Sequence, residues 1–251
     1  MKQYEAVIET LERLGGIATL GQLNQEVFKI TDCKWETKTP FASIRRIVQE
    51  RKEIYKIKPG LWALVSHKKE LEEAGFIVEN NKNASSLAIR EFNHSYYQGI
   101  LLEIGNFKNY NTFVPEQDKN KYYSNITLKE LRTLDKIPLF SYEGLVKRSS
   151  TIDVIWFNKR NMPCSFFEVE HSTDIQNSLL KFCDLQDFYT KMFIVADKKR
   201  EDEFNRKMNY EAFHSLRENN RVNFIDYDSL NKYYNQIIQG KSINNILQIN
   251  Y

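Results

Sequence analysis

Apolar residues recur at helical spacing in three segments at the start of the chain, which predicts helices over 3–14, 20–28 and 41–51. Gly15 and Gly16 end the first of these helices, and Thr19 is suited to cap the second. Two short extended segments, 54–57 and 61–65, flank Pro59 and Gly60, a pair typical of a tight turn. The pattern therefore predicts three helices followed by a β-hairpin.

This order of elements resembles the small winged helix-turn-helix domains, here over residues 1–75. The resemblance implies that the third helix enters the major groove of DNA and that the hairpin lies along the phosphates. The charge distribution agrees, because residues 1–69 hold 13 lysines and arginines against 8 aspartates and glutamates, and the rest of the chain holds 23 against 25. The candidate DNA contacts are Arg45, Arg46, Gln49, Lys52, Lys56 and Lys58. The alternative is a winged domain that contacts protein, with Arg45 and Arg46 on an ordinary solvated face.

A polar segment rich in asparagine and serine predicts a linker over 76–87 and a second domain over 88–251. That domain opens with a helix over 93–107, on which Glu103 lies beside the apolar stripe. Residues 118–121 are expected in a polar loop, and residues 136–140 in a loop or an edge strand. The pattern then predicts a hairpin (151–157 and 165–170), a helix (173–186), a buried strand (191–196), a charged helix (198–216), a strand (222–227) and a helix (230–238). The fold class is therefore α+β or α/β, an N-terminal winged helix followed by a mixed β-sheet flanked by helices.

Three carboxylates interrupt the apolar pattern of the predicted hairpin. Asp153 lies in its first strand, and Glu168 and Glu170 alternate with Phe167 and Val169 in its second, so the two glutamates share one face. Carboxylates held together repel one another, and the arrangement favours a bound cation. The alternative is that the three acids are solvated positions on an edge strand.

Asp153, fourteen intervening residues and then Glu168-x-Glu170, followed by a helix and a strand, resembles the core of the PD-(D/E)XK nuclease superfamily, which includes type II restriction endonucleases. Ile152-Asp153 and the segment 167–173, FEVEHST, carry this resemblance, which extends over about 93–228. The sequence departs from the motif twice. Ile152 stands where the motif has proline, and Glu170 stands where it has lysine.

The resemblance implies a Mg²⁺-dependent endodeoxyribonuclease that cleaves double-stranded DNA, most simply a sequence-specific type II restriction enzyme. Asp153, Glu168 and the Val169 carbonyl would bind the metal, with Glu103 as a candidate further ligand. Glu170 would hold or deprotonate the attacking water. Cleavage of both strands implies a homodimer, and the class implies a cognate methyltransferase. Two alternatives stay open: a modification-dependent or repair nuclease, and a DNA-binding regulator with an inactive nuclease-like domain.

The remaining polar residues near the hairpin have weaker patterns. Gln176 is a candidate contact to metal-bound water, His171 a candidate hydrogen-bonding residue at the strand end, and Ser172 and Thr173 are expected to cap the next helix. The four histidines share no metal-ligand spacing, which disfavours zinc. Three cysteines without paired spacing and no apolar run of membrane length favour a cytoplasmic protein with no membrane contact.

Overall fold

The computed structural model describes residues 1–80, 82–84, 86–171, 174–218 and 220–246. The chain forms two units, Met1–Phe92 with Asn231–Tyr251, and Asn93–Leu230. This division differs from the predicted domains at two places. Residues 76–92 belong to the first unit, and the chain from Asn231 onward belongs to it as well.

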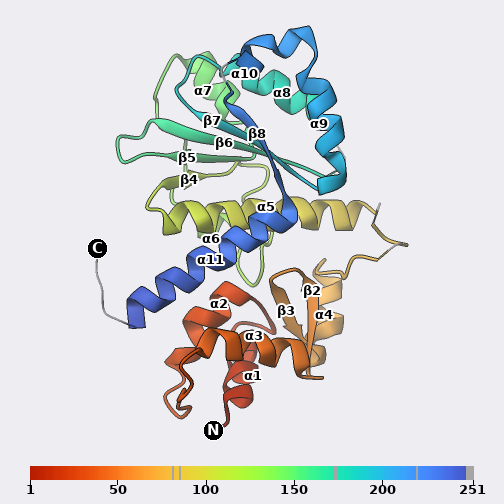
Figure 1. Cartoon of the computed structure of the whole chain (residues 1–251), viewed down its shortest axis with the longest axis vertical. Coiled ribbons are helices and arrows are strands. Elements are labelled where there is room, and N and C mark those ends of the chain that lie inside the picture. The colour runs from red at the N-terminus through yellow and green to blue at the C-terminus, as the bar shows by residue number, and fades with distance from the viewer. Residues whose placement is uncertain (81, 85, 172–173, 219, 247–251) are drawn as a thin grey trace. The chain divides into compact units, whose positions relative to one another are not determined.

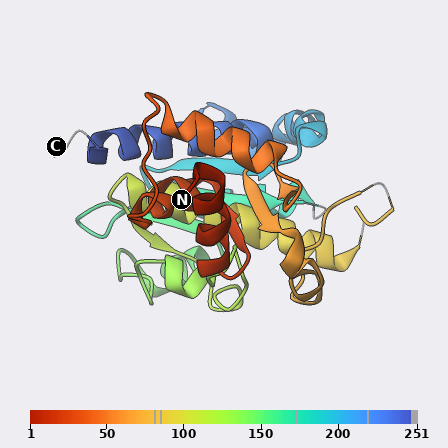
Figure 2. The same cartoon turned by 90° about the horizontal axis from the view of Figure 1, so that it is seen from below.

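The first unit contains the predicted helices and hairpin (Figure 2). Its elements are α1 (Gln3–Arg13), β1 (Ile17–Thr19), α2 (Leu20–Glu26), α3 (Pro40–Glu50), β2 (Ile54–Lys58), β3 (Leu61–Leu64) and α4 (Lys68–Glu73). The strands form an antiparallel sheet in the order β1-β3-β2. Thr19 caps α2 as predicted, since its side chain accepts a hydrogen bond from the Gln22 backbone N–H. The three-residue β1 is too short to give a pattern in the sequence.

The last helix, α11 (Tyr227–Ile246), is longer than the predicted 230–238, and its later part packs in the first unit. The hydroxyls of Tyr234 and Thr19 lie 3.2 Å apart, and both residues are buried. Gly21 leaves the space that Tyr234 and Ile238 occupy. Contacts across more than 200 residues of sequence therefore place the end of the chain in the first unit.

The second unit is built on a five-stranded sheet in the order β4-β5-β6-β7-β8 (Figure 1). The strands are β4 (Asn111–Phe113), β5 (Val154–Phe157), β6 (Pro163–Glu170), β7 (Lys191–Ala196) and β8 (Val222–Asp226). The β4, β5 and β6 strands pair antiparallel, whereas β6, β7 and β8 pair parallel, so the predicted mixed sheet is confirmed. The edge strands are β4 and β8, and residues 136–140 lie in a loop.

Helices flank the sheet as predicted, although their bounds differ. They are α5 (Leu87–Phe107), α6 (Leu128–Leu131), α7 (Glu143–Ser149), α8 (Ile175–Asp184), α9 (Glu201–Met208) and α10 (His214–Glu218). The predicted charged helix over 198–216 is divided between α9 and α10. Within the described residues, no helix combines the length and the apolar character that crossing a membrane would take.

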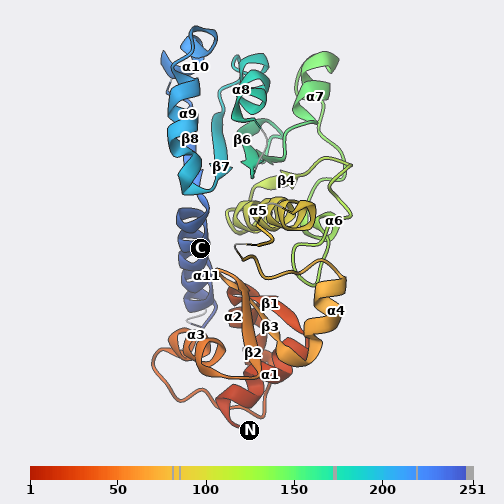
Figure 3. The same cartoon turned by 90° about the vertical axis from the view of Figure 1, so that its right-hand side faces the viewer.

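The two faces of the sheet carry different helices (Figure 3). On one face, Leu179 of α8 packs in one apolar core with Phe166 of β6. On the other, the Trp156 indole N–H donates to the Leu101 carbonyl of α5 at 3.0 Å. Because side chains alternate along a strand, Glu168 and Glu170 face α8 with Phe166, while Val169 faces α5.

The contact of α5 with the sheet is tested by two glycine-to-alanine substitutions in helices. A Cβ at Gly105 would meet Trp156 Nε1 and Thr112 Cγ2, both at 2.6 Å, whereas a Cβ at Gly144 of α7 would meet nothing within 4 Å. We expect Gly105→Ala to lower the free energy of unfolding by about 1–3 kcal/mol, and Gly144→Ala to raise it by about 0.4–1 kcal/mol. Urea denaturation measures both. Equal effects in the two variants would contradict this packing.

Candidate metal centre

Asp153, Glu168 and Glu170 converge at one end of β5 and β6. Asp153 lies one residue before β5, and its Oδ2 accepts the Val169 backbone N–H at 2.7 Å. Glu168 and Glu170 are 2% and 5% exposed, and Ser178 Oγ of α8 lies 3.0 Å from Glu168 Oε2 and also contacts Glu170 Oε1. The prediction that both glutamates share a face is confirmed, and neither is a solvated position.

Burial makes these glutamates hard to ionise. Burial, together with the negative charge of Asp153, raises the pKa of Glu168 to about 8, although Lys181 acts in the opposite direction. Burial also raises the pKa of Glu170, against the hydrogen bond from Ser178. Because a hydroxyl has one hydrogen, Ser178 offers the two glutamates a single donor to share.

Lys181 of α8 supplies a positive charge to the site, and no local pattern in the sequence predicts this position for it. Its Nζ donates to Glu168 Oε2 at 2.7 Å, to Glu168 Oε1 at 3.0 Å and to the Thr151 carbonyl at 3.0 Å. Lys181 follows Ser178 by three residues and therefore lies on the same side of α8. The neighbouring Leu180 lies on the outer side of α8, with its side chain 43% exposed.

A second group joins Asp153 to a histidine and another aspartate. Ligand atoms of His94, Asp118 and Asp153 all lie within 4.8 Å of one another. His94 Nε2 is 3.5 Å from Asp153 Oδ1 and 3.9 Å from Asp118 Oδ2, and its Nδ1 donates to the Val169 carbonyl at 3.0 Å. Neither His94 nor Asp118 has a pattern in the sequence that marks it as a ligand, because Asp118 lies in a polar loop and His94 has no histidine at metal-ligand spacing.

The protonation of this group follows from its charges. Burial lowers the pKa of His94, but the carboxylates of Asp153 and Asp118 outweigh burial and raise it to about 10. Burial raises the pKa of Asp118, yet hydrogen bonds with His94, Lys121 and Gln98 hold it well below its usual range. A histidine binds metal through a neutral nitrogen, so a cation bound by His94 would replace a proton.

The other residues predicted near the site have described positions or lie outside the described part of the chain. Gln176 donates its backbone N–H to Asp174, which caps α8. Ser172 and Thr173, the expected caps, are outside the described residues. His171 and the Asn93 amide are 3.2 Å apart, in agreement with the predicted hydrogen bond. Glu103 is buried, and the contacts described for Asp153, Glu168 and Glu170 do not include it.

One predicted DNA contact is not accessible. Arg45, Arg46, Gln49, Lys52 and Lys56 are exposed. Lys58, in contrast, is 5% exposed, with its Nζ 3.4 Å from Glu79 Oε2 and 5.4 Å from the centre of the Phe92 ring. Burial lowers the pKa of Lys58, against the attraction of Glu79. A buried ammonium in this position is not accessible to a phosphate of DNA. Lys58 is therefore no longer a candidate DNA contact.

The pKa of Glu168 predicts a pH dependence of stability without metal. Between pH 4.5 and 6.5 the folded protein keeps a proton on Glu168 that the unfolded chain releases, so stability is highest at the acidic side and falls as the pH rises. We expect Glu168→Gln to flatten this fall by up to about 1.4 kcal/mol per pH unit. Urea denaturation in EDTA measures it, with Glu143→Gln on α7, an exposed position, as the control. An unchanged slope in Glu168→Gln would contradict the raised pKa.

Comparison with known proteins points to one family. The family described as the type II restriction enzyme NmeDI C-terminal domain matches residues 77–248. The type II restriction enzyme NmeDI of Neisseria meningitidis serogroup C is 26% identical to the chain over 164 residues, which are 60% of this chain and 45% of that enzyme. The chain thus spans less than half the length of this relative. No solved structure matches. The matched residues include Asp153, Glu168 and Glu170, which we call the acidic cluster, and also His94 and Asp118.

Proposed function

The chain belongs to the family of the type II restriction enzyme NmeDI C-terminal domain, and we propose from this membership that it is a metal-dependent endodeoxyribonuclease acting on duplex DNA. The observation that carries the proposal is the buried convergence of Asp153, Glu168 and the Val169 backbone with Lys181. The two carboxylates and the Val169 carbonyl offer oxygen ligands to a metal ion, and the Lys181 ammonium is a cation that could contact a phosphate. We also propose that this sheet is the core of a PD-(D/E)XK nuclease.

The donor set fits Mg²⁺. Mg²⁺ prefers hard oxygen ligands and is held by one or two carboxylates and several waters. Asp153 and Glu168 would hold it, with the Val169 carbonyl. Burial and the negative charge of Asp153 raise the pKa of Glu168, and a bound cation would oppose both effects. When bound, Mg²⁺ would offset the negative charge that develops on the scissile phosphate and would acidify water. His94 and Asp118 extend the set beside Asp153.

The side chains around the metal ligands have separate proposed roles. Lys181, held against Glu168, would place its ammonium near the phosphate, the work of the lysine that is absent from β6. Glu170 would then accept a proton from the attacking water, because burial raises the pKa of its carboxyl and so makes the carboxylate a stronger base than that of an ordinary glutamate. Ser178 would orient the carboxyl groups of Glu168 and Glu170, which its hydroxyl contacts.

The first unit would bind the duplex. We assign its DNA contacts to the exposed side chains of α3 and the β2 region: Arg45, Arg46, Gln49, Lys52 and Lys56. A homodimer would bring two metal centres to the two strands, and a cognate methyltransferase would protect the host DNA.

Phage DNA with and without methylation, incubated with the protein in the presence and absence of Mg²⁺, tests the proposal. Discrete fragments from unmethylated DNA that require Mg²⁺ are the expected result. Cutting of methylated DNA alone would instead indicate a modification-dependent nuclease. A mobility shift with no cutting under any condition would overturn the proposal in favour of a DNA-binding regulator.

A further inference from the structure

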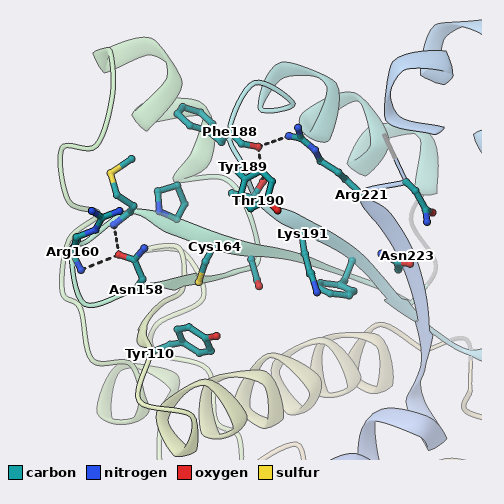
Figure 4. A pocket seen from close by; sticks show the side chains of 15 residues that line it. Tyr110, Asn158, Arg160, Cys164, Phe188, Tyr189, Thr190, Lys191, Arg221 and Asn223 are labelled. Atoms are coloured by element: carbon teal, nitrogen blue, oxygen red, sulfur yellow. Dashed lines mark hydrogen bonds between the residues drawn. The ribbon is translucent and has the colours of Figure 1, made fainter. Parts of the chain in front are cut away.

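The second unit contains a hollow of about 1030 Å³ at the end of β6 opposite the acidic cluster (Figure 4). The turn between β5 and β6, the start of β7 and the segment before β8 line it, and we refer to it as the Tyr189 hollow. Ser165 lines the hollow, whereas Glu168 and Glu170 belong to the cluster. At about 3.3 Å per residue of strand, the two sites are roughly 10–16 Å apart.

The Tyr189 hollow is positively charged. Arg160, Lys191 and Arg221 line it, and its lining includes no aspartate or glutamate. Within the part of the chain that the structure describes, none of the three forms an ion pair with a carboxylate. Three unpaired cations from three segments attract an anion.

Arg221 is held in place at the wall of the hollow. Its Nη1 donates to the carbonyls of Gln186 at 2.9 Å and Phe188 at 2.6 Å. A guanidinium has five N–H donors, and among the described residues Nε and Nη2 have no hydrogen-bond partner. A fixed guanidinium with donors to spare suits a phosphate, which accepts two parallel hydrogen bonds.

Aromatic rings lie beside these cations. Tyr189 is 95% exposed, and Arg221 Cζ lies 5.7 Å from the centre of its ring. Tyr110 and Phe193 are half-buried in the lining, and Tyr110 stacks on Trp156 at 5.4 Å. A ring as exposed as Tyr189 buries little surface in the fold itself, but offers a face on which a base can stack.

We infer that the Tyr189 hollow binds a nucleotide, with the phosphate on Arg160, Lys191 and Arg221 and the base on Tyr189. The volume is at the upper end of the range of roughly 300–1,000 Å³ for small-molecule sites. The nucleotide is either free in solution or a unit of a DNA strand, and both present the same chemistry. The inference needs neither the metal nor the acidic cluster, so it does not rest on the proposed nuclease activity.

Isothermal titration with the full chain in EDTA tests the inference, using thymidine monophosphate and a single-stranded thymidine hexanucleotide. We expect Tyr189→Ala to weaken binding roughly 5- to 100-fold, the range for loss of one stacked base. Lys191→Ala should weaken it as well and make the dependence of log K on log salt shallower by about 0.7 for the hexanucleotide. Tyr142→Ala and Lys136→Ala, exposed positions outside the hollow, are the matched controls and should bind as the wild type does.

The outcomes separate the two sources of the ligand. Equal affinity for both compounds identifies a free nucleotide, and binding of the hexanucleotide alone identifies a unit of DNA. Absence of binding to either compound would overturn the inference, as would equal losses in the hollow variants and their controls. Binding in the hollow by a protein that never cuts phage DNA would refute the nuclease proposal and leave this inference intact.

Discussion

Replacing Asp153 by asparagine or Glu168 by glutamine is expected to lower the rate of DNA cleavage by about 10³-fold or more, or ~4 kcal/mol of transition-state stabilisation. Both substitutions keep the shape of the side chain and remove its charge. The carbonyl oxygen of the new amide could still accept the Val169 N–H in the first variant and the Ser178 hydroxyl in the second, so the fold should be kept. What is lost is the negative charge that would hold the metal.

The measurement is the rate of plasmid cleavage under single-turnover conditions, with binding to the same DNA measured in Ca²⁺ by mobility shift. Glu143→Gln on α7 is the matched control, since Glu143 is exposed and is not among the described contacts of the cluster. DNA binding should stay within about twofold of the wild type, because neither substitution changes the DNA contacts proposed for the first unit. Cleavage at the wild-type rate by both variants would remove Asp153 and Glu168 from the active site.

Replacing Lys181 by methionine is expected to lower the cleavage rate by about 10²- to 10³-fold with little change in DNA affinity. Methionine keeps much of the apolar length of the side chain and removes the ammonium that donates to both Glu168 oxygens. Loss of an interaction that strengthens only as charge develops on the phosphate lowers the catalytic rate and leaves binding of the DNA nearly unchanged.

Lys147→Met, an exposed lysine on α7, is the control for the change in charge. Glu170→Gln completes the comparison, because β6 carries Glu170 where the PD-(D/E)XK motif has lysine. A Lys181→Met protein that cuts at the wild-type rate, beside an inactive Glu170→Gln protein, would show that Glu170 alone does the work of the lysine. Slow cleavage by both variants supports separate roles for the cation and the proton acceptor.

The hairpin and its acids could be predicted from the sequence because their signals are local. Alternation of apolar and polar residues in β6 places Glu168 and Glu170 on one face, and this face is set within the strand itself. The apolar run of β7 predicted a strand covered on both sides, and β7 is the central parallel strand between β6 and β8. The ends of the helices were predicted less accurately than the strands, since the single helix expected over 198–216 is divided between α9 and α10.

The proposed DNA contacts of the first unit show where local patterns stop being informative. Lys56 and Lys58 alternate on the same strand with equal charge, and the sequence suggests the same role for both. Glu79 and Phe92, more than 20 residues further along the chain, cover Lys58 and leave Lys56 exposed. The same kind of distant contact fixes α11 in the first unit through Tyr234.

Local patterns in the chain are sufficient to predict the mixed sheet, the shared face of Glu168 and Glu170, and the nearness of Asp153 to them through the hairpin. The charges that surround these acids, in contrast, come from elements distant in the sequence. His94 reaches Asp153 across 59 residues of chain, Asp118 joins from a loop, and Lys181 approaches Glu168 from α8. Periodicity records which face of an element is buried, whereas the partner of a buried charge depends on how separate elements pack. The acids could therefore be predicted from the sequence, whereas the cations that offset their negative charge could not.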